Sequence, residues 1–168
     1  MSPTVLVAGI GNIFRTDDGF GPEVVRRLAE PAAGPLPEGV RVVDYGIRGM
    51  HLAYDLLDGY DVLVLVDAMP AGDQPGEVSV LQVGEDDLGT GEFDAHGMDP
   101  VAVLANLDQL GGTLPPTYVV GCRPESVEDG IGLSAAVAAA VPEAAGTVTR
   151  LLAELGSAPT ANAGKEGD

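Results

Sequence analysis

The chain has 168 residues, of which 45% are hydrophobic, so it is long enough and apolar enough for one compact domain with a sizeable core. Its 26 acidic and 8 basic residues give a net charge of −18, which excludes proteins that bind nucleic acid or anionic membrane surfaces. A single cysteine excludes an intramolecular disulfide framework, and no apolar run approaches the roughly 18 residues needed to span a bilayer. Because the first residues lead straight into a strand-like run without a charged leader, we expect a cytoplasmic protein.

The predicted elements alternate between short apolar runs, typical of buried strands, and stretches in which apolar residues recur at helical spacing. The fourth strand alternates polar and apolar residues and should lie at an edge of the sheet. The pattern β-α-β-α-β-β-α-β-α predicts an α/β fold, with a mostly parallel sheet and helices on both faces. The predicted strands are Val5–Ile10, Val40–Asp44, Val62–Val66, Glu77–Val83 and Thr117–Cys122, and the predicted helices are Gly21–Glu30, Met50–Leu57, Pro100–Leu110 and Leu133–Leu155.

The C-terminal part of the chain carries two further signals. Pro142 interrupts the last predicted helix, so we expect a kink or a break into two helices there. The final stretch, GSAPTANAGKEGD, has no apolar face to bury. We therefore predict a single domain over residues 1–155 and a disordered tail over residues 156–168.

Acidic or imidazole side chains occur in three separate stretches where a parallel sheet gathers its loops. Asp18 follows the first strand, Asp67 ends the third, and His96 lies in the long connection after the fourth. Ligands of open parallel sheets bind at the carboxyl ends of the strands, so these side chains can reach one rim if the first and third strands are close. Two carboxylates and an imidazole form a suitable ligand set for one divalent metal ion.

Each of these residues also has a simpler interpretation. Asp18 and its neighbour Asp17 can cap the helix that follows them. Asp67 can bond nearby loop amides, and His96 can be a solvated loop residue. From the residues alone, these interpretations stay open beside the metal site.

Four other residues are weaker candidates for the site or argue against other kinds of site. Asp44 ends the second strand as Asp67 ends the third, but it is a weaker candidate, and His51 should lie on the exposed face of its helix. Cys122 is predicted to be a small buried hydrophobe, because a reactive thiol needs a cationic neighbour. Phe14 stands where a dinucleotide-binding loop needs its third glycine, which argues against nucleotide binding. The absence of a G-x-S-x-G motif argues against a serine hydrolase.

Several motifs occur in a fixed order along the chain. They are G-x-G-N-x-x-x-x-D-D-G-x-G at Gly9–Gly21, D-x-G-x-x-G-M at Asp44–Met50, V-D-A at Val66–Ala68, the His96 loop, and G-x-x-P-E-S followed by G-I-G-L at Gly121–Leu133. In these motifs the chain resembles the hydrogenase maturation proteases, the endopeptidases that trim the C-terminal extension from the large subunit of nickel–iron hydrogenases. Several motifs in one order are far more specific than any one alone.

The resemblance implies a three-layer α/β/α sandwich around a five-stranded sheet. It also implies that Asp18, Asp67 and His96 form the catalytic site and hold a metal, the nickel of the immature substrate, for which other divalent ions can substitute. The first acidic ligand is Glu in some family members and Asp in others, so Asp18 fits with a shorter reach. The partner is then a hydrogenase large-subunit precursor, and we expect the enzyme to act as a monomer.

Three other functions compete with this one. A non-catalytic nickel-dependent binding or chaperone module shares the ligand set but hydrolyses nothing. An aspartate-dependent phosphatase usually carries a D-x-D pattern directly after the first strand, where this chain has Gly9–Asn12. A nucleotide-linked oxidoreductase lacks its third glycine. The sequence leaves open which hydrogenase is the substrate and which group attacks the peptide bond.

Overall fold

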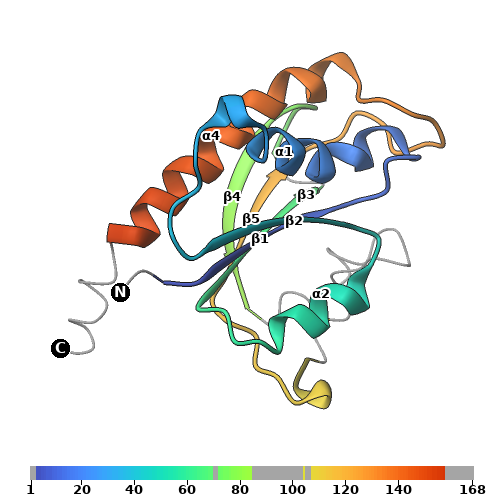
Figure 1. Cartoon of the computed structure of the whole chain (residues 1–168). Helices are drawn as coiled ribbons and strands as arrows, with labels where there is room; N and C mark the ends of the chain where they lie inside the picture. The colour runs from blue at the N-terminus through green and yellow to red at the C-terminus, as the bar shows by residue number, and fades with distance from the viewer. Residues whose placement is uncertain (1–2, 70–71, 85–103, 105–106, 158–168) are drawn as a thin grey trace.

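The computed structural model describes residues 3–69, 72–84, 104 and 107–157. Their strands form one five-stranded sheet in the order β2-β1-β3-β5-β4 (Figure 1). The strands β1, β2, β3 and β5 are parallel, and β4 pairs antiparallel with β5 at the edge. The mostly parallel sheet and the edge position of the fourth strand are therefore confirmed. The strand bounds are β1 Val5–Ile10, β2 Val40–Gly46, β3 Val62–Ala68, β4 Val78–Val83 and β5 Thr117–Cys122.

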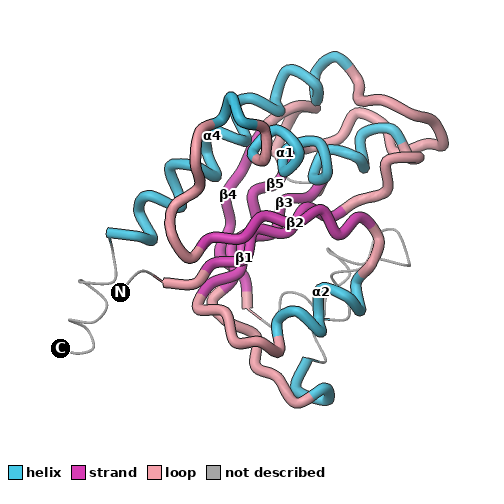
Figure 2. Tube along the Cα trace, viewed as in Figure 1, coloured by secondary structure: helices cyan, strands magenta, loops and turns pink. Residues whose placement is uncertain are grey.

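Helices cover both faces of the sheet (Figure 2). The helices α1 and α4 share one buried cluster with one face of the sheet, and α2 packs on the other face. This arrangement is the three-layer α/β/α sandwich that was predicted. The helix bounds are α1 Phe20–Leu28, α2 Gly49–Leu56 and α4 Ala135–Ser157, with one-turn 3-10 helices η1 Thr16–Gly19 and η2 Pro31–Ala33.

The central strand β1 explains why the sequence signal of this fold is strong. All six of its residues are buried, because it pairs on both sides and lies between two helical layers. Val5 and Val7 pack on the α1 and α4 side, whereas Leu6 and Ala8 pack on the α2 side. A strand covered on both faces has no polar position, so it appears in the sequence as a continuous apolar run.

Pro142 lies inside α4, which runs from Ala135 to Ser157 as one helix. Of the two predicted outcomes at this proline, the break into two helices is therefore wrong, and the kink stays a prediction. Pro142 is exposed, whereas Val141 and Val148 are buried, so the packing of the apolar helix face offsets the lost backbone hydrogen bond. The helix also includes residues 156 and 157, the first two residues of the predicted tail. Residues 158–168 lie outside the described residues, so the disordered tail stays a prediction.

Most of the helix predicted at Pro100–Leu110 also lies outside the described residues. Its described part, residue 104 and residues 107–110, is 3-10 helical. Leu104 and Leu107 are fully buried in the cluster on the α2 side of the sheet. Among the helices in the described part of the chain, none is long and apolar enough to cross a membrane.

Candidate active site

The carboxyl ends of β1 and β3 are adjacent, because these strands pair directly, with Gly9 opposite Val66. The segment after β1 therefore starts beside the end of β3, and its one-turn helix η1 contacts β3. Asp18 lies in η1, and Asp67 is the next-to-last residue of β3. The sequence set one condition for a shared site, that the first and third strands be close, and the sheet order meets it.

Two glycines let α1 approach the ends of these strands. A β-carbon on Gly21 would lie 2.1 Å from the carbonyl oxygen of Val66 and 2.4 Å from that of Ile10. A β-carbon on Gly9 would lie 2.6 Å from a methyl carbon of Val25. Because no side chain fits at either position, the first turn of α1 rests directly on the ends of β1 and β3.

The carboxylate of Asp18 is anchored in the loop after β1. The residue is only 8% exposed, and its Oδ2 accepts a hydrogen bond of 2.8 Å from the backbone N–H of Asn12. Gly11 has a φ of 144°, and a β-carbon there would lie 1.8 Å from the carbonyl oxygen of Asp18. Only glycine fits at this position, so the loop after β1 can close onto η1.

Asp67 is half-buried and lies opposite Gly121 of β5. His96, the third member of the predicted set, lies outside the described residues. Within residues 3–69, 72–84, 104 and 107–157, no three or more His, Cys, Asp or Glu side chains gather closely enough to hold a metal ion. The structure therefore brings Asp18 and Asp67 to neighbouring elements at one edge of the sheet, and the complete ligand set stays a prediction.

Asp17, the first aspartate of the pair, is fully buried and binds a distant loop. Its Oδ2 accepts hydrogen bonds from the backbone N–H groups of Glu125 at 2.9 Å and Ser126 at 3.2 Å. Ser134 donates twice, from its N–H to Oδ1 at 2.7 Å and from its hydroxyl to Oδ2 at 2.9 Å. The Ser134 hydroxyl also accepts a hydrogen bond of 3.4 Å from the N–H of Val137 in α4. One buried carboxylate thus ties η1 to the start of α4.

Neither aspartate caps the helix that follows it. Gly19 is the N-cap of α1, and no side chain makes a capping hydrogen bond there, so the capping interpretation of Asp17 and Asp18 is wrong. The partners of Asp17 come from the P-E-S motif and from the residue that follows G-I-G-L. The two adjacent aspartates therefore have different tasks, since Asp17 holds a remote loop and Asp18 lies at the candidate site.

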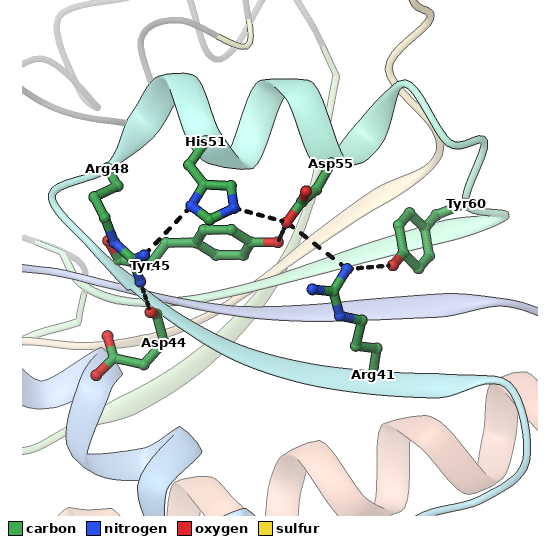
Figure 3. Close-up of polar contacts among 7 residues, drawn as sticks. All are labelled: Arg41, Asp44, Tyr45, Arg48, His51, Asp55 and Tyr60. Atoms are coloured by element: carbon green, nitrogen blue, oxygen red, sulfur yellow. Dashed lines mark hydrogen bonds and ion pairs between the residues drawn. The ribbon is translucent and has the colours of Figure 1, made fainter.

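A polar cluster joins β2 and the loop after it to α2 (Figure 3). The fully buried Tyr45 donates a hydrogen bond of 2.5 Å from its hydroxyl to Oδ2 of Asp55 on α2. The same carboxylate oxygen lies 3.7 Å from Nη1 of Arg41 and 3.7 Å from Nε2 of His51. Burial, together with the hydrogen bond to Asp55, raises the pKa of Tyr45 well above its ordinary value, so the hydroxyl stays protonated.

Arg48 completes this cluster from within the loop (Figure 3). Its guanidinium donates to the carbonyl oxygens of Asp44 and Tyr45, and Nη1 lies 3.3 Å from Nδ1 of His51. The loops after β1 and β2 line a hollow of about 300 Å³, to which Phe14 and Arg48 contribute. Sequence reasoning assigned His51 only to an exposed helix face and missed the cluster. The signal was the i, i+4 spacing of His51 and Asp55 on one helix.

Cys122 is a buried thiol at the end of β5. Burial, with a smaller contribution from the negative charge of Asp17, raises the pKa of Cys122 to about 11. A thiol with such a pKa is protonated at neutral pH and is a poor nucleophile. The prediction of a small buried hydrophobe is confirmed.

Comparison with known proteins identifies the family. A family model described as hydrogenase maturation protease (HycI) matches residues 22–151. The chain is 33% identical over 163 residues to the hydrogenase expression/formation protein HupD of Rhizobium leguminosarum bv. viciae, which covers 95% of this chain and 79% of HupD. It is also 33% identical over 154 residues to the hydrogenase 2 maturation protease of Escherichia coli K12, which covers 90% of this chain and 92% of that protein. The chain belongs to the hydrogenase maturation protease family.

Solved structures of related maturation proteases share the fold of this one. The hydrogenase maturating endopeptidase HybD from E. coli has a TM-score of 0.76 at 32% identity, over 91% of this chain and 94% of HybD. The maturation protease HybD from Thermococcus kodakarensis has a TM-score of 0.68 at 27% identity, over 89% of this chain and 99% of that chain. The resemblance predicted from the motifs is therefore confirmed, and the chain is a hydrogenase maturation endopeptidase.

The contribution of the buried Asp17 carboxylate to the stability of this maturation protease can be measured directly. Replacing Asp17 with Ala removes the acceptor of the part-buried hydrogen bonds from the backbone amides of residues 125, 126 and 134, and a hydrogen bond to a charged group contributes about 1.5–3 kcal/mol. We expect the free energy of unfolding in urea to fall by about 3 kcal/mol or more. The exposed Asp58→Ala change should alter it by less than about 0.5 kcal/mol. Equal stability of the two variants would contradict the role assigned to Asp17.

The hydroxyl of Tyr45 gives a second prediction. Tyr45→Phe removes one hydrogen bond to a carboxylate and should lower the free energy of unfolding by about 1.5–3 kcal/mol at pH 7. Because the pKa of Tyr45 is raised in the folded state, its contribution is complete below about pH 10 and is lost as the pH rises further. Tyr54→Phe, at a residue that is 56% exposed on α2, the helix that carries Asp55, is the matched control. Equal effects of the two changes on urea denaturation would count against the buried cluster.

Proposed function

We propose that this maturation protease removes the C-terminal extension from the large-subunit precursor of a nickel–iron hydrogenase and uses the precursor's nickel to recognise it. The observation that carries the proposal is that η1, which contains Asp18, contacts β3, which contains Asp67, at one edge of the sheet in a chain of this family. The names of the relatives agree with a role in hydrogenase assembly, since they include a hydrogenase formation protein and a hydrogenase 2 maturation protease.

In this proposal, Asp18, Asp67 and His96 bind the nickel of the precursor through two carboxylates and an imidazole. Such a set of oxygen and nitrogen donors suits divalent first-row metals, and a nickel site shares this chemistry with other ions. Two carboxylates at one edge repel each other, and a bound cation removes that repulsion. The enzyme therefore favours a precursor that already carries nickel, so that processing follows metal insertion.

In this proposal, the precursor's nickel, bound by both proteins, brings the scissile peptide bond to the edge of the sheet that carries Asp18 and Asp67. A divalent metal in this position polarises the peptide carbonyl or lowers the pKa of a bound water. Hydrolysis then breaks the C–N bond, adds hydroxyl to the carbonyl carbon and gives a proton to the leaving amine. The bond from the N–H of Asn12 holds Asp18 in one orientation during these events, because it fixes one carboxylate oxygen.

The proposed partner is the large-subunit precursor. In this proposal the enzyme is a monomer and binds the precursor in the cytoplasm. The net charge of −18 supports a soluble protein whose copies repel each other and which avoids nucleic acid and anionic lipid. A lone, buried cysteine is in keeping with a reducing compartment.

The proposal is tested by single substitutions at the predicted ligands. Asp67→Ala and His96→Ala should leave the protein folded but slow the cleavage of a nickel-loaded precursor by more than about 100-fold, because even residues that only orient metal ligands contribute 10–100-fold. Cleavage is measured by the mass lost from the large subunit, and folding by circular dichroism. The wild-type enzyme should leave a nickel-free precursor intact.

The exposed Asp58→Ala change serves as the control, because Asp58 lies in the loop before β3, at the opposite end of that strand from Asp67. Full cleavage by Asp67→Ala and His96→Ala would refute the ligand assignment. If the wild-type protein binds the nickel-loaded precursor without any loss of mass, the chain is a non-catalytic nickel-dependent module instead.

A further inference from the structure

A groove lies between α1 and the first half of α4, on the face of the sheet opposite α2. Its volume is about 550 Å³. In Figure 1 these two helices run side by side, and the segment that leads into α4 lies near the loop after β1. The groove begins at Thr16 and Gly19 of η1, the element that also carries Asp18. Its lining residues are Ile13, Thr16, Gly19, Glu23, Arg26, Arg27, Ile131, Gly132, Leu133, Ala138, Val141 and Pro142.

The end of the groove near the candidate site is apolar and exposed. Ile131 is 80% exposed and Ile13 is 46% exposed, although both belong to fixed loops. The loop of Ile131 is held by two hydrogen bonds of 2.9 Å, from the N–H of Gly130 to the carbonyl of Phe14 and from the N–H of Thr16 to the carbonyl of Gly130. Apolar side chains that fixed loops keep exposed to solvent indicate a surface that binds a partner.

The far end of the groove carries positive charge, in a chain with 26 acidic and only 8 basic residues. Arg26 pairs with Glu23 at 3.1 Å, so these two charges cancel. Arg27 has no ion pair among the described residues and leaves one net positive charge in the groove. Since α1 rises about 1.5 Å per residue, Arg26 and Arg27 lie about 10 Å along the helix from Gly19. About three residues of an extended peptide span this distance.

We propose that this groove binds the C-terminal extension of the precursor, directly downstream of the bond that is cleaved; the inference rests on the proposed function. An apolar side chain of the extension packs against Ile13 and Ile131, and an acidic side chain about three residues further on reaches Arg27. A groove between two packed helices admits one extended chain but no folded domain. The extension has a free end, so it fits there, whereas the folded body of the large subunit stays at the rim.

The first test maps what lies in the groove. A photo-crosslinking amino acid replaces Ile131, which tolerates the change because it is 80% exposed, and a second variant carries it at Tyr54 on α2 as the control. After irradiation with the nickel-loaded precursor, position 131 should crosslink to the extension and position 54 should not. Crosslinks from position 131 to the body of the large subunit, or to a second copy of this chain, would overturn the proposal.

The second test is a charge exchange. Arg27→Glu should raise the KM for the precursor by about tenfold and change kcat little, because a like charge then faces the acidic side chain of the extension. Precursors with Lys placed singly at the first six positions of the extension should include one that restores the KM of this variant. Arg150→Glu, in the exposed part of α4, is the control for net charge.

The two proposals fail in different ways. If the wild-type protein does not cleave the nickel-loaded precursor, the proposed function is wrong whatever the groove binds. If it does cleave, but Arg27→Glu behaves like Arg150→Glu and no Lys position restores its KM, the function stands and the groove proposal is wrong.

Discussion

The buried carboxylate of Asp17 is the interaction on which the candidate active site depends. It joins η1 to residues 108 to 117 positions away in the sequence, through four hydrogen bonds of 2.7 to 3.2 Å. A carboxylate without exposure is stable only when its oxygens are satisfied in this way. Because Asp18 follows directly, the contacts that hold Asp17 also place Asp18. Because Ser134 immediately precedes α4, the same carboxylate also sets the lip of the groove between α1 and α4.

The order of the strands is the second feature that positions the candidate site. Direct pairing of β1 with β3 brings their carboxyl ends together, and the contacts of Gly9 and Gly21 leave space only for backbone between α1 and these ends. Backbone packing thus brings together the two elements that carry Asp18 and Asp67, η1 and β3. In the proposed metal site, such packing would fix the backbone of both ligands in advance and favour binding, because little would have to be ordered on contact.

The sequence predicts the sheet and its carboxyl edge, but it does not predict the separate roles of Asp17 and Asp18 or the burial of Tyr45. The run Val5–Ile10 and the aspartates at strand ends indicate the sheet and its functional edge, because burial on both faces leaves a direct mark on residue type. The sequence could not exclude a helix break at Pro142, because the cost of a proline is local whereas the packing that offsets it depends on where α4 lies. Asp17 and Asp18 are identical in type and adjacent, so only the tertiary fold separates their tasks. The burial of Tyr45 depends likewise on α2 covering it.

The central claim is that Asp18, Asp67 and His96 hold one cation at the carboxyl edge of the sheet. Calorimetric titration of the purified protein with Ni²⁺ tests it most directly, with Asp18→Asn, Asp67→Asn and His96→Ala beside the wild type and the exposed Asp58→Asn as the control. The account predicts one ion per chain, and an affinity at least about 10-fold weaker in each of the three variants, with the control unchanged. Equal affinity in wild type and in any of the three variants would contradict it.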